Sequence, residues 1–190
     1  EVVRINIHYT LKTNGTGNFT ETGDNQGNTL TGYQFAKDVV DLMNQYQLSN
    51  IQMTLPPNNT TPNPPKNYYY VLEAIYFHRD NNYHVFNNPG YSVWNLREHS
   101  DSVVNVFYSG SPVNNSANNN DQVGGYVLSS SLNHNSKVKY TEIGSVYTRY
   151  VNYLNRVASG QTDNYSWVLN AVARTTEHEI GHLLGMNHTV

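Results

Sequence analysis

The first eighty residues carry a strand–helix–strand pattern that restricts the topologies open to this chain. In residues 2–11, VVRINIHYTL, apolar and polar side chains alternate, which predicts a half-buried strand. The side chains expected on its outer face are Arg4, Asn6, His8 and Thr10. Residues 31–47 then repeat apolar side chains at helical spacing, with Thr31 as the N-cap, and residues 68–80 predict a second strand. Such a crossover is right-handed and makes the two strands largely parallel.

Three more strands and a long helix are expected in the rest of the chain. The expected strands are residues 102–108, 124–130 and 137–148, followed by a helical turn or two within 150–159. Residues 166–185 predict a helix with one apolar stripe. The side chains of that stripe are Leu169, Ala173, Thr176, Ile180, Leu183 and Leu184. No internal repeat or linker divides the sequence, so we expect residues 1–190 to form a single α/β domain.

The last predicted helix runs into the sequence HEIGHLLGMNH, which holds three of the eight histidines. His178 and His182 are four residues apart, so their imidazoles project from one helix face, one turn apart. Gly185 suits the left-handed residue that ends many helices, after which the chain can turn and bring His188 back. Three neutral imidazoles leave a fourth zinc position open for water, as catalytic zinc sites require. We therefore expect these histidines to bind one catalytic Zn²⁺.

Glu179 directly follows the first expected ligand and would stand beside the metal-bound water rather than on the metal. Zinc lowers the pKa of such a water to about 7 and can polarise a peptide carbonyl. The pattern thus predicts metal-assisted hydrolysis with Glu179 as the general base. The alternative is a secreted module that binds zinc without catalysis and serves in binding or adhesion, since tyrosines, of which there are sixteen, can line sugar-binding surfaces. Such a module would keep its binding activity in chelator.

The spacing from His178 to His188 resembles the extended motif of the metzincin zinc metallopeptidases. HEIGHLLGMNHT, with VVNVFY and GGYV upstream, is similar to the pappalysin-like branch. The resemblance implies an endopeptidase acting on proteins or peptides, with a twisted five-stranded mixed sheet, an early helix and a C-terminal active-site helix. It also implies that Gly125, Tyr126 and Val127 lie on an edge strand that holds an extended substrate by strand addition.

Metzincins carry a methionine-containing turn and a lower subdomain after the third histidine. The methionines of this chain are Met43, Met53 and Met186, and none follows His188. We therefore expect the chain to end before the methionine turn and the lower subdomain to be absent from it.

Composition narrows the range of partners. A formal net charge of −3 provides no basic stripe for phosphates, which disfavours nucleic acid. No apolar run approaches the roughly 20 residues of a membrane helix. The lack of cysteine excludes thiolate nucleophiles and cysteine zinc sites. Because only 13% of the residues are charged, we expect a secreted or cell-surface bacterial protein whose signal is not present in this chain.

Other patterns give weaker signals. TGDNQGNT (22–29) and NNNDQ (118–122) could hold Ca²⁺, but neither has the spaced carboxylates of a calcium loop, which favours flexible polar loops. GTGNFT has Thr20 where a dinucleotide-binding loop needs its third glycine. The remaining histidines are expected to be structural or solvated. They are His8, His78, His84, His99 and His134.

Overall fold

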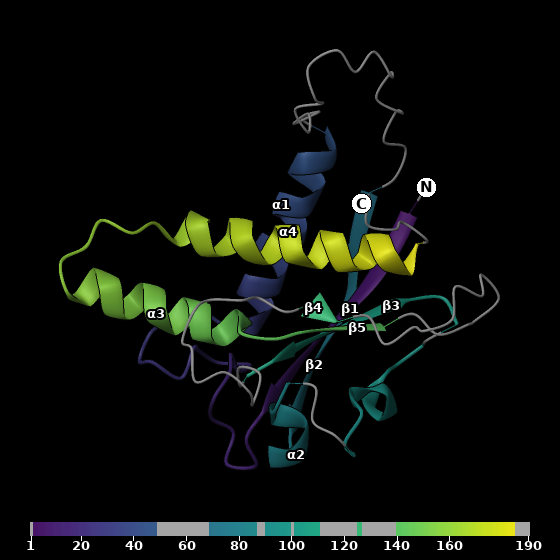
Figure 1. Cartoon of the computed structure of the whole chain (residues 1–190), viewed down its shortest axis with the longest axis horizontal. Helices are drawn as coiled ribbons and strands as arrows, with labels where there is room; N and C mark the ends of the chain where they lie inside the picture. The colour runs from purple at the N-terminus through teal and green to yellow at the C-terminus, as the bar shows by residue number, and fades with distance from the viewer. Residues whose placement is uncertain are drawn as a thin grey trace.

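The computed structural model of the 190-residue chain describes residues 2–48, 69–86, 90–99, 101–110, 125–126 and 140–184. Its elements in chain order are β1 (Val2–Leu11), α1 (Gly32–Leu48), β2 (Tyr69–Arg79), α2 (Asn81–His84), the 3-10 helix η1 (Val93–Leu96), β3 (Val104–Ser109), β4 (Gly125–Tyr126), β5 (Tyr140–Ile143), α3 (Val146–Ala158) and α4 (Tyr165–Leu183) (Figure 1). Several features named above lie outside the described residues: Val127, His134, Gly185, His188 and the segment 118–122.

The strands form one sheet in the order β2-β1-β3-β5-β4. β1 pairs in parallel with both β2 and β3, and β3 pairs in parallel with β5. β4 is antiparallel to β5 and lies at the edge of the sheet. α1 connects the parallel strands β1 and β2, as the strand–helix–strand pattern predicts. The expectation of a mixed α/β fold is confirmed in these terms, with four strands running parallel.

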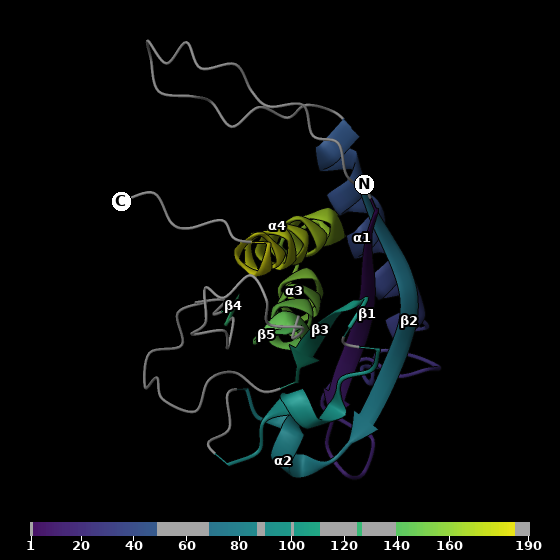
Figure 2. The ribbon, with the colours of Figure 1, turned by 90° about the vertical axis from the view of Figure 1, so that its right-hand side faces the viewer.

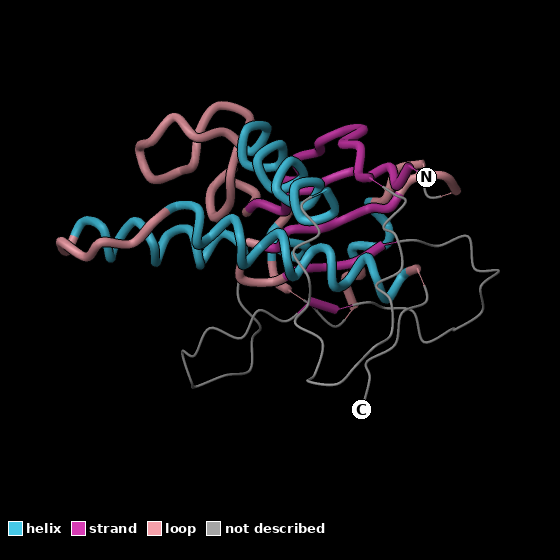
Figure 3. Tube along the Cα trace, turned by 90° about the horizontal axis from the view of Figure 1, so that it is seen from above, coloured by secondary structure: helices cyan, strands magenta, loops and turns pink. Residues whose placement is uncertain are grey.

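One face of the sheet carries the main hydrophobic core. From β1, the fully buried side chains on this face are Ile5, Ile7, Tyr9 and Leu11. Helices α1, α3 and α4 cover them, with Phe35, Tyr150 and Val172 among the residues that complete the cluster. Figure 2 shows α3 and α4 on the same side of the sheet, and in Figure 3 the helices lie over the strands. The apolar side chains at every second position of β1 and those at helical spacing on α1, α3 and α4 therefore pack into one core.

The opposite face of β1 is covered as well, which corrects the half-buried strand expected from the alternation. The polar side chains that are fully buried there are Asn6, His8 and Thr10. Arg4 remains exposed. A second apolar cluster, built on Val93, Phe107 and Tyr140, packs on this side of the sheet. Alternation along a strand tells which residues share a face, but not whether a later segment covers that face.

Hydrogen bonds fix the tautomer of the buried His8. Asn105 Oδ1 accepts the backbone N–H of Glu98 at 3.0 Å, which identifies this side-chain atom as the oxygen. His8 Nε2 lies 2.8 Å from the same oxygen and must donate to it. His8 Nδ1 is then an acceptor and takes the Nε2–H of His78 at 2.9 Å. Burial, reinforced by His78, lowers the pKa of His8 to about 3, so the ring is neutral.

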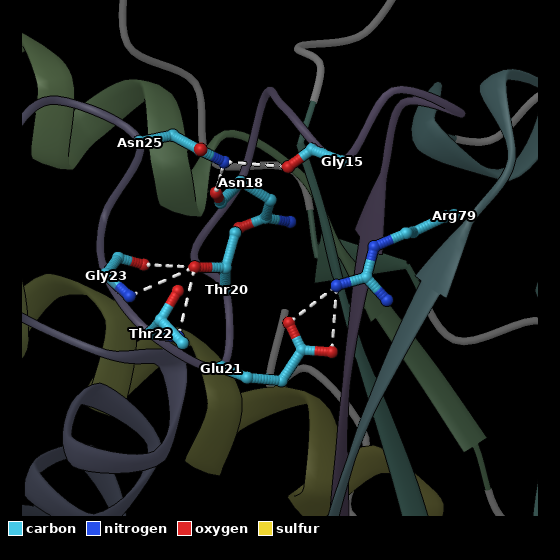
Figure 4. A network of polar contacts seen from close by, with 8 residues as sticks. All are labelled: Gly15, Asn18, Thr20, Glu21, Thr22, Gly23, Asn25 and Arg79. Carbon is cyan, nitrogen blue, oxygen red and sulfur yellow. Dashed lines mark hydrogen bonds and ion pairs between the residues drawn. The ribbon is translucent and has the colours of Figure 1, made fainter.

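The loop between β1 and α1 is held by its own polar side chains (Figure 4). Thr20 Oγ1 accepts the backbone N–H of Gly23 at 3.0 Å and donates to the carbonyl of the same residue at 2.9 Å. Asn25 Nδ2 donates to two backbone carbonyls, 3.0 and 2.7 Å away. Glu21 forms a two-pronged ion pair with Arg79 at the end of β2, at 2.9 and 2.7 Å. These contacts tie the loop to the sheet.

Asp24, the carboxylate of the TGDNQGNT segment, is fully buried and surrounded by donors. Its Oδ1 accepts the backbone N–H groups of Gln26 and Asn28 at 2.8 and 2.9 Å. Its Oδ2 accepts Asn28 Nδ2 and the Tyr150 hydroxyl, both at 2.7 Å. Burial raises the pKa of this carboxyl, but the hydrogen bonds, led by that of Tyr150, outweigh burial and lower it. A calcium ion bound here would have to displace four donors.

The segment 137–148, expected to be a strand, is shared in its described part between β5 and α3. Ser145 stands between the two elements in a left-handed conformation with a φ of 62°. Tyr147 and Tyr150 then pack their rings against Phe19 at centroid distances of 5.4 and 4.9 Å. The two tyrosines are three residues apart, so a helix places both on its buried face against the N-terminal loop. The helical turn or two expected here is in fact a helix of 13 residues.

Two short helices were not expected from the sequence. α2 begins where Asp80 accepts the backbone N–H of Asn82 at 2.8 Å, and η1 begins where Ser92 accepts that of Trp94 at 3.3 Å. α2 lies beyond the end of β2 (Figure 2), and η1 packs on the second face of the sheet through Val93. Among the described residues, no helix combines the length and the apolar character that a membrane span needs.

Candidate metal centre

α4 presents the predicted histidine pair from a helix whose other face is fixed to the sheet. At its start, Asn164 Oδ1 accepts the backbone N–H of Ser166 at 3.0 Å. In its middle, the buried Thr176 hydroxyl lies 3.0 Å from the hydroxyl of Tyr108 on β3. Ile180 is fully buried, as the predicted stripe requires, whereas Leu184, placed in the same stripe, is exposed at the end of the helix. The helix is thus anchored along its length.

The imidazoles of His178 and His182 meet on the outer side of α4. Their Nε2 atoms are 3.0 Å apart, and the two ring planes are nearly perpendicular, with centroids 4.5 Å apart. His178 is exposed and His182 is partly buried, so the pair faces away from Ile180. A hydrogen bond across this distance needs one Nε2 as donor and the other as acceptor, with the roles set by the tautomers of the two rings.

The donors and the spacing of the pair fit a zinc ion. Two nitrogens on tetrahedral zinc, each about 2.0–2.1 Å from the metal, lie about 3.3 Å apart. The observed 3.0 Å differs from that by a few tenths of an ångström, which small rotations of the two side chains supply. Within the part of the chain that the structure describes, no group of three or more His, Cys, Asp or Glu side chains is placed to hold a metal. His188, the third expected ligand, lies outside that part.

Glu179 lies on α4 between the two histidines in sequence and is shielded from water. Its side chain is 7% exposed, in contrast to the exposed His178 beside it. It continues the buried flank of the helix that includes Val168 and Val172. Glu179 is therefore a buried carboxylate one residue from the exposed His178.

β4 lies at one edge of the sheet and holds two of the residues that the resemblance implies for substrate binding. Gly125 pairs with Ile143 and Tyr126 with Glu142 in antiparallel register, and α4 contacts both β4 and β5. β4 is paired with β5 and has no strand on its other side in the described sheet. Val127, the third residue predicted to bind substrate, lies outside the described residues.

Sequence reasoning missed a buried carboxylate on β5. Glu142 is almost fully buried, and Ser109 at the end of β3 donates its hydroxyl to Oε1. The signal in the sequence was a glutamate within the short strand YTEI, where both neighbours are buried. Glu142 is the register partner of Tyr126, so it lies one strand in from the edge of the sheet.

The other described histidines are buried or partly buried in the fold or, in the case of His99, solvated. His8 and His78 belong to the hydrogen-bonded chain on the second face of the sheet. His84 is buried with its Nδ1 3.2 Å from the carbonyl of Thr10, and its burial lowers its pKa. His99 is exposed in a left-handed turn with a φ of 50°.

Comparisons with family models, with curated proteins and with solved structures found no match to this chain.

Proposed function

We propose that this protein is a zinc-dependent endopeptidase in which His178, His182 and His188 hold the metal and Glu179 is the general base. The observation that carries the proposal is the meeting of two imidazole Nε2 atoms 3.0 Å apart on an anchored helix. The buried carboxylate at the next position and the metzincin-like spacing of the motif support the same assignment. A secreted or cell-surface location is part of the proposal and rests on composition alone.

Zinc, when bound, makes a water molecule acidic near neutral pH and polarises the peptide carbonyl. Glu179 takes a proton from the attacking water while the water oxygen bonds to the carbonyl carbon. As the carbon–nitrogen bond breaks, Glu179 gives that proton to the leaving amine, so the carboxylate is regenerated. Burial of Glu179 keeps its carboxylate from turning into solvent during these transfers.

The substrate is proposed to be a protein or peptide in extended form. Backbone groups at the outer side of Gly125, Tyr126 and Val127 would pair with it as an added strand. Support for this comes from the position of β4 at the edge of the sheet and from its contact with α4.

The test is the single change Glu179→Gln, measured for zinc content and for cleavage of an unfolded protein substrate. We expect the variant to retain the metal and to lose activity by at least about a hundredfold, because general acid–base catalysis supplies about 10²–10⁴-fold. Glu177→Gln is the matched control, since it makes the same chemical change two residues away and is expected to leave the rate unchanged. An active Glu179→Gln protein would refute the assignment of the base.

The second candidate is a zinc-binding module without catalysis that serves in binding or adhesion. An open cavity near the start of α4, lined in part by the exposed Trp167, favours it. A wild-type protein that binds zinc stoichiometrically but cleaves no member of a random peptide library would establish this candidate in place of the first.

A further inference from the structure

A cavity of about 310 Å³ opens where α3 and α4 meet the loop that joins them. This volume is at the lower end of the range for small-molecule sites, about 300–1,000 Å³. Arg149, Asn152 and Arg156 border it from α3, and Trp167 and Ala171 border it from α4. Each set recurs every three to four residues, so each helix turns one continuous stripe toward the cavity.

The cavity lining includes several polar side chains, whereas two packed helices normally meet through apolar residues. Asn152 and Asn155 on α3 and Asn164 at the start of α4 contribute three amide groups. The buried Val168 is part of the apolar lining. Ligand sites combine an apolar lining with a few polar groups that fix the orientation of the ligand, and this cavity has both kinds of residue.

An ion pair fixes one wall of the cavity in place. Arg156 donates through Nε and Nη2 to the two carboxylate oxygens of Asp163, with the Nη2 contact at 3.1 Å. Two-pronged contacts of this kind hold both side chains in one orientation. Asn164, the next residue, is held by its capping bond to Ser166.

Trp167 is the feature of the cavity that the fold does not explain. Its side chain is 74% exposed, the largest value among the exposed large hydrophobic side chains of the described residues. Tryptophan is highly buried on average, and surface tryptophans concentrate where a partner covers them. Trp167 lies in the first turn of α4, where its backbone N–H donates to the carbonyl of Asn164 at 2.9 Å.

The cavity is separate from the candidate metal centre. Trp167 precedes His178 by eleven residues, which is about 16 Å along α4. The two sites can therefore be tested independently.

From this arrangement we infer that the α3–α4 cavity is a saccharide-binding site in which Trp167 stacks on a pyranose ring. The negative π face of an indole attracts the C–H groups on the flat side of such a ring. The three asparagine amides provide donors and acceptors together, which matches hydroxyl groups, since a hydroxyl is also both. Phosphate is the competing ligand, because Arg149 lines the cavity beside the Arg156–Asp163 pair, but phosphate has no C–H face on which Trp167 could stack. This site goes beyond the proposed peptidase activity.

The experiment is a titration of the Trp94→Phe variant, in which Trp167 is the one remaining tryptophan. The probes are cellobiose, N,N′-diacetylchitobiose, lactose and 3′-sialyllactose, with inorganic phosphate as the competing chemistry. We expect at least one saccharide to shift the Trp167 emission saturably, with the same affinity for wild-type protein by calorimetry. Trp167→Ala is expected to weaken that binding by roughly tenfold or more, and Asn152→Ala to weaken it measurably.

Tyr69→Ala is the matched control, because it removes an exposed aromatic side chain outside the cavity and is expected to leave saccharide binding unchanged. Binding is also expected to persist in chelator and in Glu179→Gln, which separates this inference from the peptidase proposal. The inference is overturned by failure of every saccharide to bind, by full binding to Trp167→Ala, or by phosphate binding alone.

Discussion

The buried His8 makes the stability of this protein depend on pH in a calculable way. In the folded state its pKa is about 3, lowered by burial and by His78, against 6.5 for an ordinary histidine. Between these values the unfolded chain binds a proton at this position and the folded protein does not. The unfolded state then holds more protons, so the free energy of unfolding falls as the pH falls.

The magnitude follows from the two pKa values. At pH 5 the unfolded histidine is almost fully protonated, and the expected loss of stability relative to neutral pH is about 2 kcal/mol. The full loss, about 5 kcal/mol, is reached only below pH 3. The pKa values of His78 and His84 are also lowered by burial, so both add losses of the same sign, although the charge of Glu98 opposes the shift at His78. Carboxylates titrate mostly below pH 5, so the change in the free energy of unfolding between pH 7 and pH 5 comes mainly from histidines.

The assay is urea unfolding of wild type and His8→Gln between pH 7 and pH 5, in chelator so that metal binding contributes nothing. The variant is less stable at pH 7, but its loss between the two pH values should be smaller than that of wild type by about 2 kcal/mol. His99→Asn is the control, because it removes an exposed histidine at a position with positive φ that asparagine tolerates. Identical pH dependence in wild type and His8→Gln would refute the burial argument.

Two further pairs of changes test the packing around the loop and the second face of the sheet. Asp24→Ala should lower the free energy of unfolding by about 3 kcal/mol or more, because four buried donors lose their carboxylate acceptor. Tyr150→Phe removes only one of these donors and should lower the free energy of unfolding by about 1–3 kcal/mol. Gly110→Ala should prevent stable folding, since its Cβ would lie 2.2 Å from the ring of His84. Gly27→Ala is the comparison: its Cβ meets no atom within 4 Å, and only its positive φ should lower the free energy of unfolding, by about 1 kcal/mol. Thermal and urea unfolding measure all four, and equal costs for the two glycine changes would contradict the clash.

Much of the architecture could be read from periodicity. The alternation in β1, the helical spacing of α1 and the aromatic run of β2 each report a local geometry, and chirality then fixes the crossover between them. The histidine pair was predictable for the same reason, because residues four apart on a helix meet whatever surrounds them.

What the sequence did not reveal depends on contacts between distant segments. Tyr147 was expected in a strand, and only a helical turn or two was expected from Tyr150 onward. Both residues belong to α3, where their rings pack on Phe19 and their hydroxyls bond to Asp24. The saccharide cavity was missed because Trp167 and the asparagines of α3 come together only when two helices are placed side by side. Local pattern carries no information on such partners.

The bonds from α3 to Asp24 also bear on the order in which this chain can fold during synthesis. Tyr147 and Tyr150 follow Asp24 by 123 and 126 residues. The loop after β1 therefore cannot form these hydrogen bonds until α3 has been synthesised. β1 likewise pairs with β3 about a hundred residues later. Contacts of such long range are associated with slow folding, and the early segments are therefore the ones most exposed to aggregation before the later strands and helices arrive.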